Sequence, residues 1–272
     1  MLAALREVPV DSARPRVLGA HLEGPFISPQ RLGTHLASAQ RQPDLGLLDR
    51  LLDGGPVRLM TLAPELPGAG DLIDRLFERG VVVSLGHSDA SAEQANAAFD
   101  RGVRTVTHVF NAMRPLHHRN PGLVGAALAR EDVIVQMILD GVHLAPETAR
   151  VVWNAARGRV ALVTDAITAA GGADGRYSLG ELDVEVQNGV PRNPNGTLAG
   201  SVLTMIEAVR NLVALGADLL DAVDAATAVP ARVLGLREVG RLAVELPADI
   251  VVLDDRLEIV RVLVGGEVRV AA

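Results

Sequence analysis

The sequence contains no cysteine and few aromatic residues, and both absences restrict how the protein is built. Without cysteine it has neither disulfide bonds nor a thiolate zinc site, so His and carboxylate side chains remain as metal ligands. Aromatic residues make up only 2% of the 272 positions, whereas 49% are hydrophobic, mainly Ala, Val and Leu. Small and β-branched apolar residues are typical of buried parallel strands and closely packed helices.

Excess positive charge and long apolar runs are also missing. The formal net charge of −7 argues against nucleic acid or an anionic membrane surface as the partner. No apolar run approaches the roughly 20 residues of a membrane-spanning helix, and no secretory signal peptide is visible. We therefore expect a cytoplasmic protein with no nucleic-acid partner and no membrane partner.

Short apolar segments alternate with helical patterns along most of the chain. Strands are expected at residues 16–22, 57–62, 81–85, 104–109, 133–139, 160–163 and 197–198. Helices are expected at 44–52, at 71–79, from a cap at Ser88 or Asp89 to Gly102, and at 146–157. A further helix is expected to follow residue 201 and to end at 215. This alternation predicts a parallel α/β architecture, one strand short of a (β/α)8 TIM-type barrel.

Three segments stand outside the alternation. Residues 177–191 alternate around a QNGV turn, which predicts an antiparallel hairpin inserted at about 175–192. Residues 248–270 predict two strands around Gly265-Gly266, and Met1–Glu7 has an amphipathic, helix-like pattern. We therefore divide the chain into a barrel at 1–240 and C-terminal strands at 241–272.

Five ionisable side chains follow expected strands, on what would be a single rim of the barrel. Reacting residues of such barrels cluster at the carboxyl ends of the strands. Taken singly, a strand-end His is usually a hydrogen-bonded structural residue, and an Asp there is a helix cap or a solvated carboxylate. Together they favour a shared site: Glu23, His87, His108, His143 and Asp165.

The residue types at this rim indicate metal-assisted hydrolysis. Glu23, His87 and His108 form a set of one carboxylate and two imidazoles, which suits zinc or a similar divalent ion with one position left open for water. Asp165 is then placed to take a proton from that water and pass it to a leaving nitrogen. Asn111 and Arg119 follow His108 in a loop and are candidates for binding an anionic group, although Arg119 alone is equally explained as a surface ion-pair residue.

Several motifs together carry a family resemblance. HLEGPFIS, GHSDA, THVFNAM, PLHHRNPG, DGVH, LVTDAI and GTLAGS, in this order, resemble the N-acetylglucosamine-6-phosphate deacetylases of the amidohydrolase superfamily. The tail GRLAVELPADIVVLD resembles the returning strands of the small β-sandwich that accompanies the barrel. The resemblance covers essentially the whole chain. It implies a metal-dependent hydrolase barrel with a remnant of the β-sandwich, and removal of acetate from N-acetylglucosamine 6-phosphate to give glucosamine 6-phosphate.

The resemblance also implies roles for individual residues. Glu23, His87 and His108 match the ligands of one divalent metal ion per chain, with zinc favoured over iron, cobalt or manganese. Asp165 matches the catalytic base and acid, and His35 would help to polarise the acetyl carbonyl. The implied substrate contacts are Thr34 and His35 at the amide, Asn111 and Ala112, Arg119 at the phosphate, His143 at sugar hydroxyls, and Leu198, Ala199 and Gly200 in a loop that closes over the sugar. A homodimer is implied, whose partner subunit completes the phosphate pocket.

The sequence departs from the family in three places. The N-terminal part of the sandwich is not found, nor is the first barrel strand with its HxH-like motif, which carries ligands for a second metal in some members. An unpaired edge at 16–22 then predicts a marginally stable chain. Arg114 stands where the loop often has a small residue. Two alternatives remain open: an amidohydrolase acting on another N-acyl substrate, and a non-catalytic sugar-phosphate-binding fragment.

Overall fold

Six parallel strands form the central sheet of the protein. The computed structural model describes residues 2–7 and 15–271. The strands follow one another across the sheet in chain order, as the strands of a barrel do. They are β1 (Ala20–Glu23), β2 (Val57–Leu62), β3 (Val82–Leu85), β4 (Thr105–Val106), β5 (Ile134–Met137) and β6 (Val160–Leu162).

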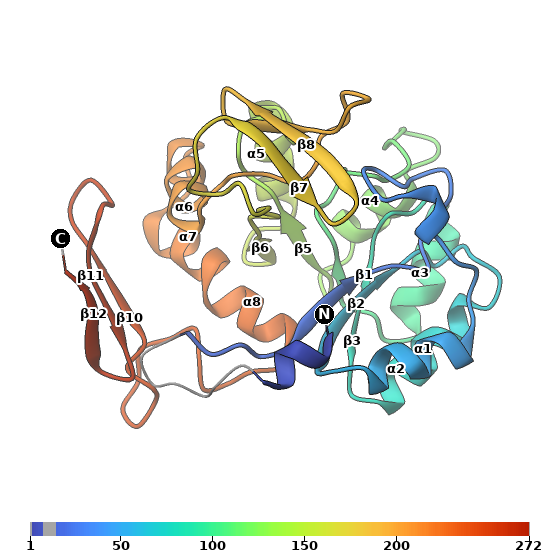
Figure 1. Ribbon diagram of the computed structural model, residues 1–272, viewed down its shortest axis with the longest axis horizontal. Helices are drawn as coiled ribbons and strands as arrows, with labels where there is room; N and C mark the ends of the chain where they lie inside the picture. The colour runs from blue at the N-terminus through green and yellow to red at the C-terminus, as the bar shows by residue number, and fades with distance from the viewer. Residues whose placement is uncertain (1, 8–14, 272) are drawn as a thin grey trace.

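Eight α-helices of the described chain lie around the curved sheet (Figure 1). Their apolar faces pack on the outside of the strands; in α2, for example, Leu72, Ile73 and Leu76 are almost fully buried. The helices are α1 (Leu45–Asp53), α2 (Ala69–Glu78), α3 (Ala92–Asp100), α4 (Gly122–Ala129), α5 (Pro146–Ala155), α6 (Met205–Ala214), α7 (Leu219–Ala226) and α8 (Ala228–Val233). Two short 3₁₀ helices, η1 (Leu2–Arg6) and η2 (Ala37–Ala39), complete the set. Met1, part of the expected N-terminal helix, lies outside the described residues.

Helix α4 was not predicted from the sequence. Its residues, GLVGAALA, are apolar on all sides, so the polar face that identifies a surface helix is missing. Leu123, Val124 and Ala127 are completely buried, and the helix contacts both α3 and α5. A helix that is enclosed in this way needs no polar face, so its sequence does not alternate between apolar and polar residues.

Helix α3 and strand β4 both differ from their predicted bounds. The N-cap of α3 is Ser91, not Ser88 or Asp89: Ser91 Oγ accepts the Gln94 N–H, and the Gln94 side chain accepts the Ser91 N–H. The helix ends at Asp100, just before Gly102, as predicted. Strand β4 is much shorter than the expected 104–109, because the backbone turns into the left-handed region at His108. Strand β1 likewise begins at Ala20 instead of Arg16.

The prediction of a seventh parallel strand at 197–198 was wrong. Leu198 forms an antiparallel bridge with Arg192, and the parallel contact beside β6 is a single bridge between Ala166 and Ser201. Gly196 and Gly200 adopt positive φ angles of 80° and 64°, which bend the chain on both sides of this segment. Within residues 2–7 and 15–271, the parallel sheet therefore has six strands, with β1 at one edge and β6 at the other.

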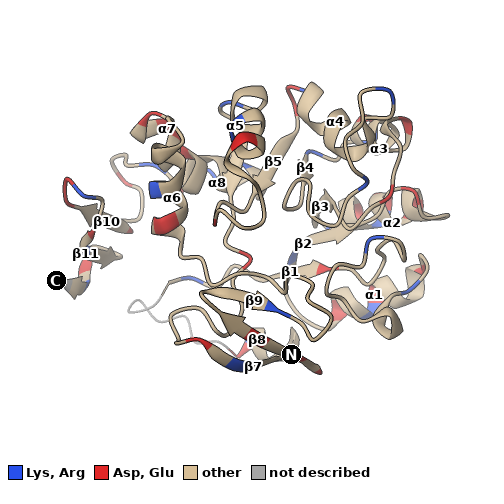
Figure 2. Ribbon diagram, turned by 90° about the horizontal axis from the view of Figure 1, so that it is seen from above, with Lys and Arg blue, Asp and Glu red and all other residues tan. Residues whose placement is uncertain are grey.

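The inserted segment forms a three-stranded antiparallel sheet, where a two-stranded hairpin was expected. Its strands are β7 (Gly175–Leu179), β8 (Leu182–Gln187) and β9 (Val190–Arg192). The turn predicted at 187–190 is present, with positive φ at Asn188 and Gly189. In Figure 2 this sheet lies along one side of the molecule, on the side of β1. Asn193, just after β9, donates to Thr34 Oγ1 at 3.5 Å and so connects the insertion to the loop that follows β1.

The C-terminal strands also number three where two were expected. They are β10 (Ile250–Leu253), β11 (Ile259–Val264) and β12 (Glu267–Ala271), and Figure 1 shows them beside α6 and α7, away from the central sheet. Arg210 of α6 reaches the turn between β10 and β11: it donates to the Leu257 carbonyl at 2.6 and 3.0 Å and pairs with Glu258 at 2.7 Å. In the described part of the chain, no helix is both long enough and apolar enough to cross a bilayer.

Candidate active site

Glu23, His87 and His108 meet at the carboxyl end of the central sheet. Glu23 is the last residue of β1, and His87 and His108 follow β3 and β4. Glu23 Oε1 lies 2.6 Å from His108 Nε2 and 2.9 Å from His87 Nε2, and the two imidazole nitrogens are 3.2 Å apart. Three strand ends therefore direct one oxygen and two nitrogens to a common point.

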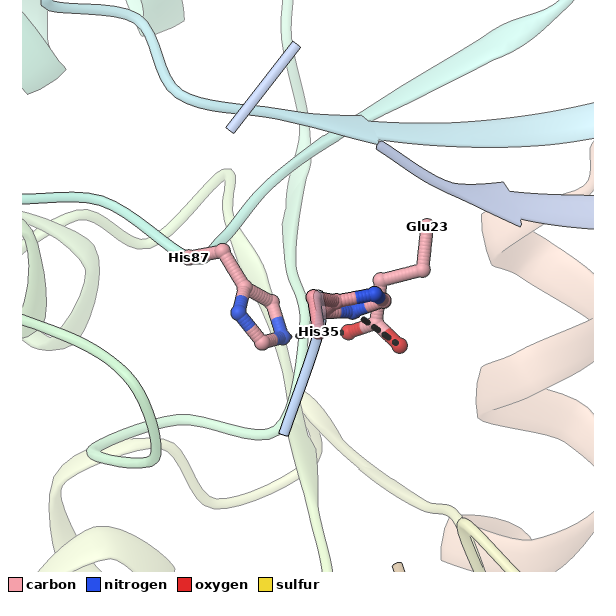
Figure 3. A group of neighbouring side chains, drawn as sticks. All are labelled: Glu23, His35 and His87. Carbon is pink, nitrogen blue, oxygen red and sulfur yellow. Dashed lines mark ion pairs between the residues drawn. The ribbon is translucent and has the colours of Figure 1, made fainter. Parts of the chain in front are cut away.

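His35 joins this group from the loop after β1. Figure 3 shows Glu23, His35 and His87 pointing toward one another from three different segments. His35 Nε2 is 3.7 Å from Glu23 Oε2, and its ring lies edge-on to that of His87 with the centroids 4.7 Å apart. Two possible sets of three metal ligands therefore share Glu23 and His87: one is completed by His108 and the other by His35. The shorter distances favour His108 as the third metal ligand and leave His35 beside the site.

The backbone is strained at three of the predicted metal-binding and catalytic residues. His87, His108 and Asp165 have φ angles of 46°, 28° and 50°, in a region that residues other than glycine rarely adopt. Phe110 and Ala112, in the loop after β4, share the feature. Such conformations cost on the order of 1–3 kcal/mol each and cluster at functional sites. Their concentration at this rim is consistent with selection for side-chain placement over local stability.

The ionisation of Glu23 and His108 is coupled. Burial opposes the charge on Glu23, but the neighbouring imidazoles, above all His108 through its hydrogen bond, outweigh it and hold the pKa of this carboxyl well below its ordinary value. Burial also opposes the charge on His108, yet the hydrogen bond and the negative charge of Glu23 raise the pKa of this imidazole. Each of the two groups therefore favours the charged form of the other.

The two imidazoles differ in their outer contacts. His87 Nδ1–H donates to the Arg31 carbonyl at 2.9 Å, so Nε2, which lies 2.9 Å from Glu23 Oε1, is the nitrogen that would bind a metal ion. His108 Nδ1, by contrast, is a buried nitrogen without a hydrogen-bond partner among the described residues. Only His87 has the outer contact that usually orients a metal-binding imidazole.

Asp165 faces the same group from beyond β6. It is accessible to solvent, but the surrounding protein and the neighbouring Glu23 carboxylate raise its pKa, while His108, His143 and His87 act in the opposite direction. Ser201 N–H donates to the Asp165 carbonyl at 2.8 Å. At Gly200, a Cβ would lie 2.6 Å from that same carbonyl oxygen, so only glycine allows this approach. The loop predicted to close over the sugar, with Leu198, the buried Ala199 and Gly200, is thus packed against Asp165.

His143 is held by a partner that the sequence analysis did not single out. Its Nδ1–H donates to Asp140 Oδ2 at 2.7 Å, and its backbone N–H donates to Asp140 Oδ1 at 2.9 Å. Both side chains are largely buried. Because Nδ1 carries the proton, Nε2 of His143 remains as an acceptor.

The remaining expected substrate contacts occupy two loops. Thr34 precedes His35 in the loop after β1, and Asn111 and Ala112 follow His108, where the Asn111 side chain donates to the His108 and Val109 carbonyls at 3.3 Å. Arg119 is exposed in the segment 115–120, where its guanidinium lies 2.7 Å from His118 Nε2. No contact in the described residues brings Arg119 to the metal-ligand group.

Sequence reasoning missed several residues around the site: His21, Arg31, Glu65, Asp89 and Asp140. His21 was detectable, because it lies two positions before Glu23 on the same strand and therefore shares its face. Its Nε2 lies 2.7 Å from Thr61 Oγ1, which in turn contacts Thr107 Oγ1 at 2.6 Å. Arg31, Glu65 and Asp89 act through contacts between loops, and Asp140 acts through a contact within its own loop; neither kind leaves a periodic signal.

The donor set fits a divalent metal ion. Nitrogen and oxygen ligands about 2.0–2.2 Å from a tetrahedral ion lie roughly 3.3–3.6 Å from one another. The donor atoms of Glu23, His87 and His108 are 2.6–3.2 Å apart, so a small outward movement of the side chains would admit the ion. A cation bound between Glu23 and His108 would replace the proton of their hydrogen bond, since metal ligands bind deprotonated.

Comparison with known proteins assigns the class. The model of the amidohydrolase family matches residues 4–269, and the chain therefore belongs to this family. Its members are metal-dependent hydrolases, in agreement with the ligand cluster described above.

The relatives within the family are deacetylases of amino-sugar phosphates. The chain is 41% identical over 277 residues to the human N-acetylglucosamine-6-phosphate deacetylase, covering 96% of this chain and 68% of the relative. It is 40% identical over 256 residues to the N-acetylgalactosamine-6-phosphate deacetylase of Escherichia coli O157:H7, covering 93% and 68%. A solved structure of a Mycobacterium smegmatis N-acetyl-D-glucosamine-6-phosphate deacetylase mutant, in complex with N-acetyl-D-glucosamine-6-phosphate, superposes with a TM-score of 0.88 at 43% identity, covering 92% of this chain and 68% of that one.

Proposed function

We propose that this protein is a metal-dependent amide hydrolase that removes the acetyl group of N-acetylglucosamine 6-phosphate, giving glucosamine 6-phosphate and acetate. The observation that carries the proposal is the convergence of Glu23, His87 and His108 within 3.2 Å on the rim that Asp165 also faces. The relatives named above support this substrate.

Each residue of the site then has a distinct task. Glu23, His87 and His108 would hold one divalent ion, zinc being favoured, with iron, cobalt and manganese as alternatives. Such an ion supplies a Lewis acid that polarises the acetyl carbonyl and lowers the pKa of water. Asp165, whose raised pKa makes it a better proton acceptor than an ordinary Asp, takes a proton from the attacking water and delivers it to the leaving amine.

The neighbouring side chains bind and orient the sugar. His35, beside Glu23 and His87, donates to the acetyl oxygen, with Thr34 next to it at the amide. His143, whose proton is held on Nδ1 by Asp140, accepts a hydrogen bond from a sugar hydroxyl through Nε2. Asn111 and Ala112 line the same space from the loop after β4, and Leu198, Ala199 and Gly200 cover the sugar beside Asp165.

We further propose a homodimer in which Arg119 binds the phosphate. The segment 115–120 supports this, because it is exposed throughout and carries both Arg119 and Leu116, whose exposed fraction is 47%. A guanidinium matches phosphate oxygens with two parallel hydrogen bonds. Light scattering of the purified protein measures the oligomeric state. We place the enzyme in the cytoplasm, since a charged sugar phosphate does not cross a bilayer unaided.

A second candidate substrate is N-acetylgalactosamine 6-phosphate. It is favoured by the 40% identity to the deacetylase of that sugar from Escherichia coli O157:H7. The two sugars differ in the orientation of one hydroxyl, so His143 and the loop at 198–200 are placed to discriminate between them.

The test combines metal content with acetate release. The wild-type chain should bind one zinc per chain and release acetate from the 6-phosphates faster than from unphosphorylated N-acetylglucosamine. His87→Ala and His108→Ala should each lose most of the metal, whereas His143→Ala, the matched control, should keep the metal and raise KM. Undiminished metal in both ligand variants would remove these ligands from the proposal. Bound metal and sugar phosphate without turnover would favour the binding-only alternative.

A further inference from the structure

The segment Ser88–Asp89, directly after His87, is contacted by three loops at once. The loop after β1 reaches it through Arg31, the loop after β2 through Glu65, and the loop after β4 through Arg114. The first and third of these loops also carry the residues expected to contact the substrate. Asp89 therefore connects those two loops and can fix their position relative to one another.

The carboxylate of Asp89 is held on both oxygens. Oδ1 accepts a hydrogen bond from Arg31 Nε at 2.8 Å and lies 2.7 Å from Arg31 Nη2 in the same ion pair, and Oδ2 accepts a hydrogen bond from Arg114 Nη2 at 2.6 Å. The hydrogen bond from Arg114, reinforced by Arg31, holds the pKa of Asp89 below its ordinary value. One carboxylate thus joins two guanidinium groups from loops that are separate in sequence.

Arg31 also contacts His87 through its main chain. Its carbonyl accepts the His87 Nδ1–H at 2.9 Å, and Ser28 N–H in the same loop donates to the His87 carbonyl at 2.8 Å. Farther along, Gly33 (φ +61°) lies so close that a Cβ there would be 3.1 Å from His87 Cε1. The loop after β1 therefore lies against the imidazole, and Asp89 binds the Arg31 side chain of this loop.

Asp89 itself is a fixed point. Glu65 Oε1 accepts the Asp89 N–H at 2.6 Å, and Oε2 accepts the Ser88 hydroxyl at 2.8 Å. On the other side, Ser88 N–H donates to the Ala112 carbonyl, and Arg114 N–H donates to the Ser88 carbonyl, both at 3.0 Å. Because the backbone of Asp89 is held in this way, its carboxylate fixes the position of any side chain that it binds.

We propose that Asp89 is a positioning residue: through Arg31 it fixes the loop after β1 on His87, so that His87 presents Nε2 to the metal and His35 stays beside it. This inference rests on the proposed metal site, but Asp89 is not itself one of the proposed metal ligands or substrate contacts. Its action resembles that of the outer-shell partners of metal ligands, whose loss costs about 10–100-fold in metal affinity.

Zinc titration of four variants tests the proposal. Asp89→Asn removes the charge at nearly constant size, and Arg31→Ala removes the guanidinium but keeps the carbonyl that binds His87. Each should weaken zinc binding by roughly 10-fold or more, and the double variant should lose little beyond either single one, because both remove the same contact. The matched control is Asp74→Asn, which breaks the exposed Arg101–Asp74 pair of 2.6 Å and should bind zinc like wild type. An affinity of Asp89→Asn within twofold of the control would overturn the proposal.

Amide hydrogen exchange of the metal-free chains separates this inference from the proposed function. In Asp89→Asn, the amides of residues 27–36 should exchange faster than in wild type, while those of the buried strand β5 keep their rates. Unchanged exchange in 27–36 would refute the attachment of this loop by Asp89, even if zinc still binds. A wild-type chain that binds no zinc, with faster exchange in the variant, would refute the metal site while leaving the loop attachment standing.

Discussion

The contact between Asp140 and His143 makes a measurable contribution to stability, and its pH dependence can be predicted. Asp140 Oδ1 accepts the N–H groups of Val142 and His143 at 2.9 Å, and Oδ2 accepts the His143 imidazole N–H at 2.7 Å. The exposed fractions of the Asp140 and His143 side chains are 14% and 6%, so water competes weakly for these bonds. Asp140→Asn removes the charge and retains one acceptor oxygen.

The magnitude follows from the shifted pKa. Burial alone would raise the pKa of Asp140, but the hydrogen bonds from the His143 side chain and from the two backbone N–H groups outweigh it and lower the pKa from 3.8 to about 2. At about 1.4 kcal/mol per pKa unit, the ionised carboxylate stabilises the fold by about 2 kcal/mol. Because the folded pKa is depressed, this stability is fully present above pH 4 and is lost as the pH falls toward 2.

Urea unfolding at several pH values measures the effect. With a chelator present throughout, so that the metal ligands do not contribute, Asp140→Asn should lower the free energy of unfolding by about 2 kcal/mol at pH 7. The difference from wild type should shrink to about 1 kcal/mol near pH 3. A titration of the Asp140 carboxyl carbon by NMR gives the folded pKa directly.

Asp254→Asn is the matched control. Asp254 Oδ1 also accepts two backbone N–H groups, from Arg256 and Glu258, but it lies on an exposed turn. Its loss should cost clearly less at pH 7. If Asp140→Asn costs no more than this control, or costs the same at pH 3 as at pH 7, the argument from a buried, charge-assisted contact is refuted.

Three further substitutions have defined outcomes. Asp165→Asn should retain metal but lose on the order of 10²-fold or more in kcat; near-normal acetate release would assign the base to another group. Arg119→Ala should raise KM for the 6-phosphate far more than for unphosphorylated N-acetylglucosamine, and equal losses on the two substrates would indicate a role in folding instead. Phe99→Ala, which empties a fully buried position, should cost about 3–5 kcal/mol in urea unfolding; Phe77→Ala, at 38% exposure, is its control and should cost much less.

Much of the fold follows from local patterns in the sequence. Strand β2 has the predicted bounds, and the parallel order of strands follows from the alternation of apolar runs with helices such as α1, which begins after Asp44 as its side-chain cap. The pattern did not reveal α4, which is apolar on all sides, or the brevity of β4, which a left-handed residue at His108 cuts short. Periodicity reports which face of an element is buried. It carries no information where every face is buried or where one backbone angle changes.

The candidate site divides in the same way. The sequence by itself determined the positions of Glu23, His87, His108 and Asp165, because the carboxyl ends of parallel strands share one edge of a sheet. Only the tertiary structure decided that His108 lies nearer to Glu23 than His35 does, and that Asp89 binds Arg31 across 58 positions of the chain. The physical reason is that contacts between loops depend on turns such as the left-handed backbone of His87 and Gly33. Those turns are stabilised by the assembled loops themselves, and residue order alone does not encode them in any repeating pattern.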